Sequence, residues 1–236
     1  MQKPRLKPTV NQTFIIVPNP GDRSGDYDFA AILDASRKLE QSGEVERACD
    51  MRYQAFQRLV ELLPDDGEIE LEWEDRTTQH ALMLIESSSI DHFLVGDFEM
   101  CAAMLEMLLE LDSEDHLGVV TRLAYAYIAL EEYELYDEIE GDIGDRTADK
   151  LILKLWSDVR RNGALDKGAL GRLKSRYAEV YDEFVADTHP ADESYIADIE
   201  SERPSRRALA RELWLQTEHL WREFPELVEA LRASRK

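Results

Sequence analysis

The chain has 236 residues, of which 50 are acidic and 28 basic, so its formal net charge at pH 7 is −22. This charge excludes a general nucleic-acid binder, because neutralising phosphates requires a basic surface. Hydrophobic residues make up 44% of the chain, which is enough for a folded core, and no run of about 18 apolar residues indicates a membrane span. Two cysteines are too few for a disulfide framework, so we expect a cytoplasmic protein.

Residues 1–27 differ in composition from the rest of the chain. They contain four prolines and little helical periodicity, and the β-prone tetrapeptide Phe14 to Val17 ends at a proline. We interpret them as an extended arm and favour a disordered terminus over a docked one. Docking stays open because an exposed Phe-Ile-Ile-Val segment would be prone to aggregation.

From residue 28 onward, apolar residues recur with helical spacing, and Gly, Pro or Asp-rich breaks separate the segments. The stretch from Glu68 to Glu74 alternates with period two. We interpret it as an extended connector or a frayed helix start, because it has no sheet to join. A shorter helix is left open after Pro190. The helices we expect cover residues 29–40, 45–63, 77–95, 98–111, 117–130, 133–139, 147–161, 167–186, 205–224 and 225–235.

A short motif recurs at three turns between paired helices. Gly43-Glu-Val-Glu-Arg-Ala48 matches Gly96-Asp-Phe-Glu-Met-Cys101, and Glu131-Glu-Tyr-Glu-Leu-Tyr136 is a weaker copy. In this motif a glycine followed by an acidic residue ends one helix and caps the next. A small residue then allows the two helices to approach each other closely.

This pattern resembles the tetratricopeptide repeat, a family that uses Gly-Asp-Tyr-x-x-Ala at this turn and Leu-Gly/Ala-x-x-Tyr in the first helix. Leu123-Ala-Tyr-Ala-Tyr127 fits the second pattern. The resemblance covers residues 28–140 and departs from the family where Glu131 replaces the turn glycine. It implies an all-α fold of antiparallel hairpins stacked as a right-handed superhelix. The regions expected are an extended or flexible arm over 1–27, acidic repeats over 28–145, and a helical region over 146–236 that continues or caps the stack.

The resemblance also implies a binding groove, because such repeats hold peptides on the concave side lined by their first helices. Some members grip a peptide's C-terminal carboxylate with Lys, Asn and Arg residues, and Arg122 matches one of these. Other residues stand at the remaining places of that set: Leu33, Arg37, Ser87 and Gly118. We still expect Arg37 and Arg122 to hold an acidic group. The groove mapped in this way is lined by Arg37, Glu86, Ser87, Ile90, Phe93, Thr121, Arg122 and Tyr125.

The negative charge is concentrated in the middle third of the chain. Residues 61–145 hold 25 acidic side chains and two basic ones, Arg76 and Arg122. Such a surface either keeps the protein dispersed in water or attracts a cationic partner. Two basic segments of the chain itself would also be attracted, the arm and the helix expected over 167–186.

No constellation of residues indicates catalysis or metal binding. The chain lacks the motifs of zinc proteases, P-loop proteins, dinucleotide-binding proteins and serine hydrolases. His92 and Cys101 fall at packing positions of the repeat, and without a third group we interpret them as structural. Trp214 and Trp221 lie on one helix, for which we favour core packing over a dimer face.

We therefore predict a protein-interaction scaffold or adaptor, without cofactor or metal, that binds a peptide or protein segment in its groove. A chaperone-like holder of basic or apolar clients is one alternative, and a self-associating module whose arm docks in the groove is another. An enzyme with no recognisable motif ranks third. The expected partner is a protein or peptide, for which charge favours a cationic one, and not a nucleic acid or membrane. A homodimer stays open.

Overall fold

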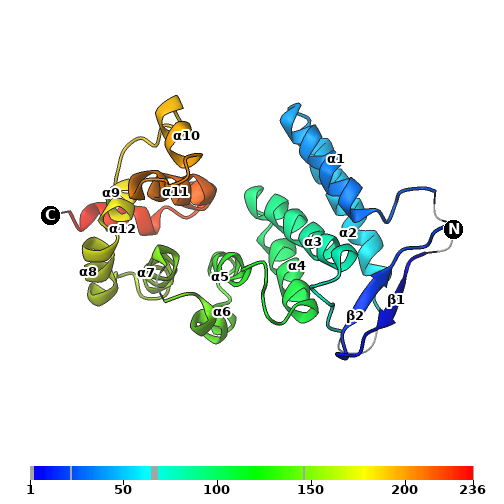
Figure 1. Cartoon of the computed structure of the whole chain (residues 1–236). Helices are drawn as coiled ribbons and strands as arrows, with labels where there is room; N and C mark the ends of the chain where they lie inside the picture. The colour runs from blue at the N-terminus through cyan, green and yellow to red at the C-terminus, as the bar shows by residue number, and fades with distance from the viewer. Residues whose placement is uncertain (1–2, 22, 65–68, 146, 236) are drawn as a thin grey trace. The chain divides into compact units, whose positions relative to one another are not determined.

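The computed structural model describes residues 3–21, 23–64, 69–145 and 147–235. Over these residues the protein is mostly helical, with twelve α-helices, 65% helix and 4% strand (Figure 1). The all-α prediction is confirmed at this level. None of the described helices is both long and apolar enough to cross a membrane. Contacts divide the chain into two compact units, residues 1–126 and 127–236, whereas the predicted boundaries after residues 27 and 145 stay predictions.

The first unit contains two helical hairpins and most of a fifth helix. Asp28, Asp75 and Asp97 cap the first turns of α1, α3 and α4 with their carboxylates, which explains where these helices begin. The helix expected over 98–111 matches at both ends, and the others end within about one turn of their predicted bounds. The helices are α1 (Phe29–Gln41), α2 (Val45–Val60), α3 (Arg76–Leu94), α4 (Phe98–Leu111) and α5 (Val120–Ala129), which spans the division.

The three turns that share a sequence motif also share a backbone geometry. Gly43, Gly96 and Glu131 have φ angles of 82°, 82° and 63°. In each turn the N–H of the following residue donates to a carbonyl in the last turn of the preceding helix. These bonds run from Glu44 to Leu39 (2.8 Å), from Asp97 to His92 (2.9 Å) and from Glu132 to Tyr127 (2.9 Å). This is the left-handed helix ending that favours glycine, so the recurring motif corresponds to a recurring local structure.

The N-terminal segment forms an antiparallel hairpin of β1 (Arg5–Pro8) and β2 (Phe14–Val17). Ile16 is 2% exposed, and its N–H donates to Thr78 Oγ1 of α3 at 3.1 Å. Phe14 pairs in parallel with Leu71, so the stretch with period two does have a strand partner. We favoured a disordered terminus, but Ile16 is buried and the rest of the tetrapeptide is half-buried, which gives this segment a reason to dock.

Most helices of the second unit are short. The single helix expected over 167–186 is wrong, because the chain breaks at Tyr177 into α8 and α9. These two helices pack against different neighbours, α8 against α7 and α9 against α11, which requires a change of direction. The elements are α6 (Tyr133–Ile139), the 3₁₀ turn η1 (Glu140–Asp142), α7 (Ala148–Asn162), α8 (Lys167–Arg176), α9 (Ala178–Phe184), α10 (Glu193–Ile199), α11 (Arg206–Glu223) and α12 (Glu226–Ala233).

The core of the second unit is aromatic. Trp156 of α7 is fully buried and meets the ring of Trp221 edge-on, with centroids 5.2 Å apart. Trp214 meets Phe184 of α9 in the same way at 5.1 Å. Both tryptophans of α11 are therefore buried, and the core interpretation of this helix is confirmed.

Candidate functional site

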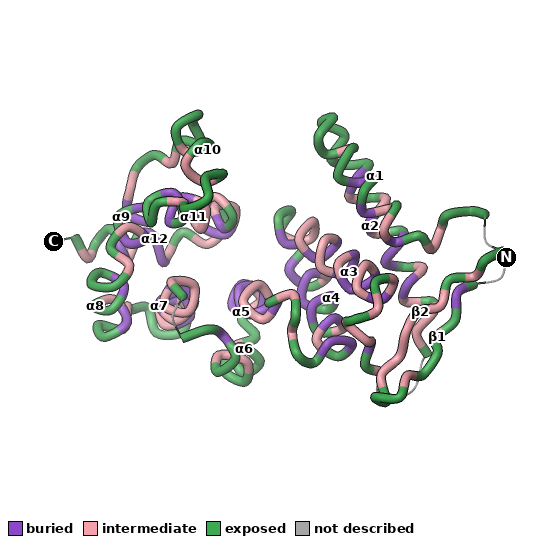
Figure 2. The backbone as a smooth tube through the Cα atoms, viewed as in Figure 1, coloured by how far each residue is buried: buried purple, intermediate pink, exposed green. Residues whose placement is uncertain are grey.

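The helices of the first unit differ in how much of their surface reaches water. Along α4, exposed residues recur at helical spacing: Glu99, Ala103, Glu106 and Glu110. On α3, by contrast, every residue from Thr77 to Phe93 is buried or half-buried, and none is exposed (Figure 2). Since α3 packs against α1, α2 and α4, these neighbours partly bury even its outer side. We call this half-buried side of α3 the α3 face.

The α3 face is close to neutral although the unit around it is acidic. Its residues follow one another at helical spacing: His80, Met83, Ser87 and Ile90. Glu86 lies beside them, and its Oε1 stands 3.6 Å from Nη1 of Arg122 on α5. Burial raises the pKa of Glu86, and the neighbouring Arg122 charge opposes that effect. The pair therefore places little net charge on the face.

The residues expected to line a groove differ in how far they are buried. Phe93 and Tyr125 are only 5% and 3% exposed, and their ring centroids lie 6.4 Å apart. These two are corrected from surface to core, because their position at the helix contact buries them. Three others are half-buried and open on one side: Ser87, Ile90 and Thr121.

The two arginines expected to hold an acidic group each have an acidic partner within the unit. Arg37 is exposed and lies 3.6 Å from Asp34 on its own helix. Arg122 is partly buried and pairs with Glu86. The structure thus brings Glu86 and Arg122 together, while the role of the whole set as a groove stays a prediction.

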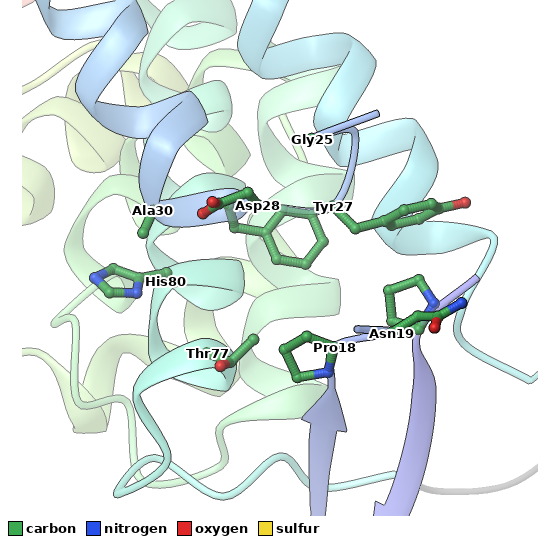
Figure 3. Close-up of a pocket in the computed structure, with 10 residues that line it drawn as sticks. Pro18, Asn19, Gly25, Tyr27, Asp28, Ala30, Thr77 and His80 are labelled. Carbon is green, nitrogen blue, oxygen red and sulfur yellow. The ribbon is translucent and has the colours of Figure 1, made fainter. Parts of the chain in front are cut away.

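A pocket of about 280 Å³ opens at the N-terminal end of the α3 face (Figure 3). Thr77 and His80 of α3 contribute to it, and Asp28 at the start of α1 lies on the same side as His80. The ring of Tyr27 lies on the opposite side, and Pro18 follows the end of β2. The other lining residues are Pro4, Asn19, Gly25, Phe29 and Ala30. The pocket therefore combines apolar walls with a polar rim.

A larger hollow, of about 1050 Å³, opens between the C-terminal ends of α2 and α4. Leu63 and Met107 give it apolar walls, and Glu110 lies on its rim. Residues 65–68 continue the chain from this rim and lie outside the described residues. We assign no site to this hollow.

A buried arginine ties three helices of the first unit together. The Arg52 side chain, 4% exposed, donates from Nε and Nη2 to the carboxylate of Asp91 on α3 at 2.7 and 2.6 Å. Its Nη1 lies 2.8 Å from Glu40 Oε1 of α1. Because the guanidinium is engaged on both sides by carboxylates, we interpret it as a structural link.

A second buried cluster fixes the segment after α9 onto α11. Arg211 donates to both carboxylate oxygens of Glu183 and, at 2.7 Å, to the carbonyl of Pro190. His189 Nδ1 lies 2.7 Å from Glu183 Oε1, and its ring stacks on Trp214 with centroids 3.9 Å apart. The Glu183 carboxylate thus has protein partners on both oxygens, which is the arrangement of a structural clamp.

The cysteines and His92 do not form a reactive cluster among the described residues. Cys49 and Cys101 are both free, and burial raises the pKa of Cys101 to about 12, which keeps this thiol protonated. His92 Nδ1 lies 2.9 Å from Asp97 Oδ2, which engages this nitrogen. Within the described residues, no group of three or more His, Cys, Asp or Glu side chains is arranged to hold a metal ion.

Comparisons with protein-family models, with curated proteins and with solved structures found no match to this chain. The class of protein is therefore defined by the structure alone. It is a protein of helical hairpins in which one central helix, α3, lacks a fully exposed side. The pocket at the end of that helix was not predicted, because its walls come from segments far apart in the sequence.

Proposed function

We propose that this protein is an interaction module that binds an extended peptide segment of a partner along the α3 face. The observation that carries the proposal is that every residue of α3 from Thr77 to Phe93 is buried or half-buried. A helix at the surface of a stack normally presents a polar stripe to water, as α4 does. The α3 face is nearly neutral and half-buried, and it instead offers a shallow surface that a second chain can cover.

The chemistry of the face suits a peptide backbone. Met83 and Ile90 supply partly exposed apolar area for side chains. Ser87 lies between them, and among the described residues its hydroxyl has no hydrogen-bond partner. A covered peptide must satisfy its N–H and C=O groups, and this hydroxyl offers both a donor and an acceptor. The three left-handed turns support the further proposal that the hairpins stack as in a right-handed tetratricopeptide-like superhelix.

The test compares two arginine substitutions. Ser87→Arg places a long charged side chain in the middle of the α3 face, and Ala103→Arg places the same side chain on the exposed stripe of α4. Peptides are selected from a random library on the unaltered protein and then titrated against all three proteins. Circular dichroism and thermal unfolding establish that both variants are folded.

We expect Ser87→Arg to weaken the affinity for the selected peptides at least tenfold, or by about 1.4 kcal/mol in binding free energy. Ala103→Arg should leave that affinity unchanged. Peptides that bind all three proteins equally would refute the α3 face as the binding surface. A library that yields no peptide above background would refute peptide binding itself.

A further inference from the structure

The pocket at the end of the α3 face contains a carboxylate, that of Asp28. Asp28 Oδ1 accepts the N–H of Ala31 at 3.0 Å, and this capping bond holds the side chain at the pocket rim (Figure 3). The nearby Asp26 has a cationic partner, Arg58, at 3.1 Å. Among the described residues, no lysine or arginine forms such a pair with Asp28. Within the described part of the chain, the pocket therefore presents one carboxylate that forms no ion pair with lysine or arginine.

The walls around this carboxylate are apolar and aromatic. Phe29 is 1% exposed and lines the pocket together with the ring of Tyr27 and the prolines Pro4 and Pro18. Lysine and arginine side chains bury their methylene stems against such surfaces while the charged end reaches a polar rim. Aromatic faces also attract cations. The combination of walls and carboxylate matches both parts of a basic side chain.

The size and the surroundings of the pocket point in the same direction. Its volume of about 280 Å³ lies just below the range of ligand pockets, which measure about 300–1,000 Å³. It thus fits one long side chain better than a whole small molecule. Residues 1–126 carry 25 acidic and 11 basic side chains. Their summed field attracts cations and repels anions.

We infer that this pocket receives a lysine or arginine side chain of the peptide that lies along the α3 face. The inference rests on the proposed function and adds its specificity: a basic residue at one end of the bound segment. It also gives the acidic first unit a role in selecting its partner. Because the charge at the pocket is partly exposed, binding should weaken as salt rises.

The test uses a substitution that removes the charge and keeps the fold. Asp28→Asn preserves the helix cap, since asparagine caps about as well as aspartate. Asp97→Asn is the matched control, because it removes one charge from another capping position of the same unit. The probes are N-acetyl-arginine amide and its neutral analogue N-acetyl-citrulline amide. Each is titrated into the full chain and followed by NMR at Tyr27, Ala30 and His80.

We expect the arginine probe to cause saturable chemical-shift changes in the unaltered protein. The citrulline probe should bind this protein at least fivefold more weakly, and the arginine probe should bind Asp28→Asn at least fivefold more weakly. Asp97→Asn should bind as the unaltered protein does. Equal binding of both probes, no effect of Asp28→Asn, or no saturable shift would each overturn the inference. Peptides that depend on Ser87 but tolerate Asp28→Asn would leave the proposed function standing and refute only the basic-side-chain pocket.

Discussion

The third left-handed turn carries a residue that its backbone does not favour, which allows a quantitative prediction. Glu131 has a φ of 63°, a conformation that costs a non-glycine residue about 1–2 kcal/mol. Glycine removes this strain, but its extra freedom in the unfolded chain offsets about 0.4–1 kcal/mol. Glu131→Gly should therefore be more stable than Glu131→Ala by about 1 kcal/mol.

The alanine variant is the correct reference because both substitutions remove the same ion pair. Glu131 Oε1 lies 2.9 Å from Arg160 Nη2, and the Glu131 side chain is 67% exposed, so this pair contributes at most about 1 kcal/mol. Stability of the second unit is measured by urea unfolding. Trp73 lies in the first unit, so in a Trp73→Phe background the remaining tryptophans, 156, 214 and 221, report on residues 127–236 alone. A glycine variant no more stable than the alanine variant would refute the left-handed assignment of this turn.

The first turn supplies the converse experiment. Gly43 has a φ of 82°, and a Cβ built there would meet no atom within 4 Å. Gly43→Ala should therefore cost about 1 kcal/mol from backbone conformation alone, without steric clash. Asparagine, which tolerates this region, should cost less than alanine. Equal stability of the alanine variant and the unaltered protein would contradict this account.

Three further outcomes follow from buried and titrating groups. Arg52→Met leaves its carboxylate partners unpaired and should cost about 3 kcal/mol, with faster hydrogen exchange in α1 and α2; an unchanged exchange pattern would count against the link. A hydrogen bond to Asp112 raises the pKa of His116 above 6.5. The stability that His116 contributes is therefore complete below that value and is lost as pH rises through its folded pKa; Asp112→Asn should lower this pKa in an NMR titration. Cys49 should react with a thiol reagent before the fully buried Cys101, and equal rates would contradict the burial.

Helix positions were predictable where periodicity and capping agree. The helix over 98–111 has a capping aspartate before it and an apolar residue at its last position, and both ends match. The break at Tyr177 was not predictable, because no glycine or proline marks it. It is imposed by the different packing partners of α8 and α9, which local sequence does not encode.

The site was predictable in part. Helical spacing identifies Ser87 and Ile90 on one side of α3, and the structure leaves both half-open. Spacing does not reveal how closely a neighbouring helix approaches, so Phe93 and Tyr125 were expected at the surface but are buried. The pocket was missed because it requires knowing where the N-terminal hairpin docks. The apolar tetrapeptide indicates a need to dock but not its location.

Hydrogen bonds between β2 and the connection before α3 make the lengths of these two stretches of the chain depend on each other. Phe14 N–H donates to the carbonyl of Glu70 at 2.7 Å, and Glu72 N–H donates back to Phe14 at 2.8 Å. Leu71 N–H in turn donates to the last residue of α4, Leu111, at 2.8 Å. An insertion or deletion in either stretch therefore removes hydrogen-bond partners from the other. Length changes in the hairpin and in this connection should accordingly occur together in natural variants of the chain.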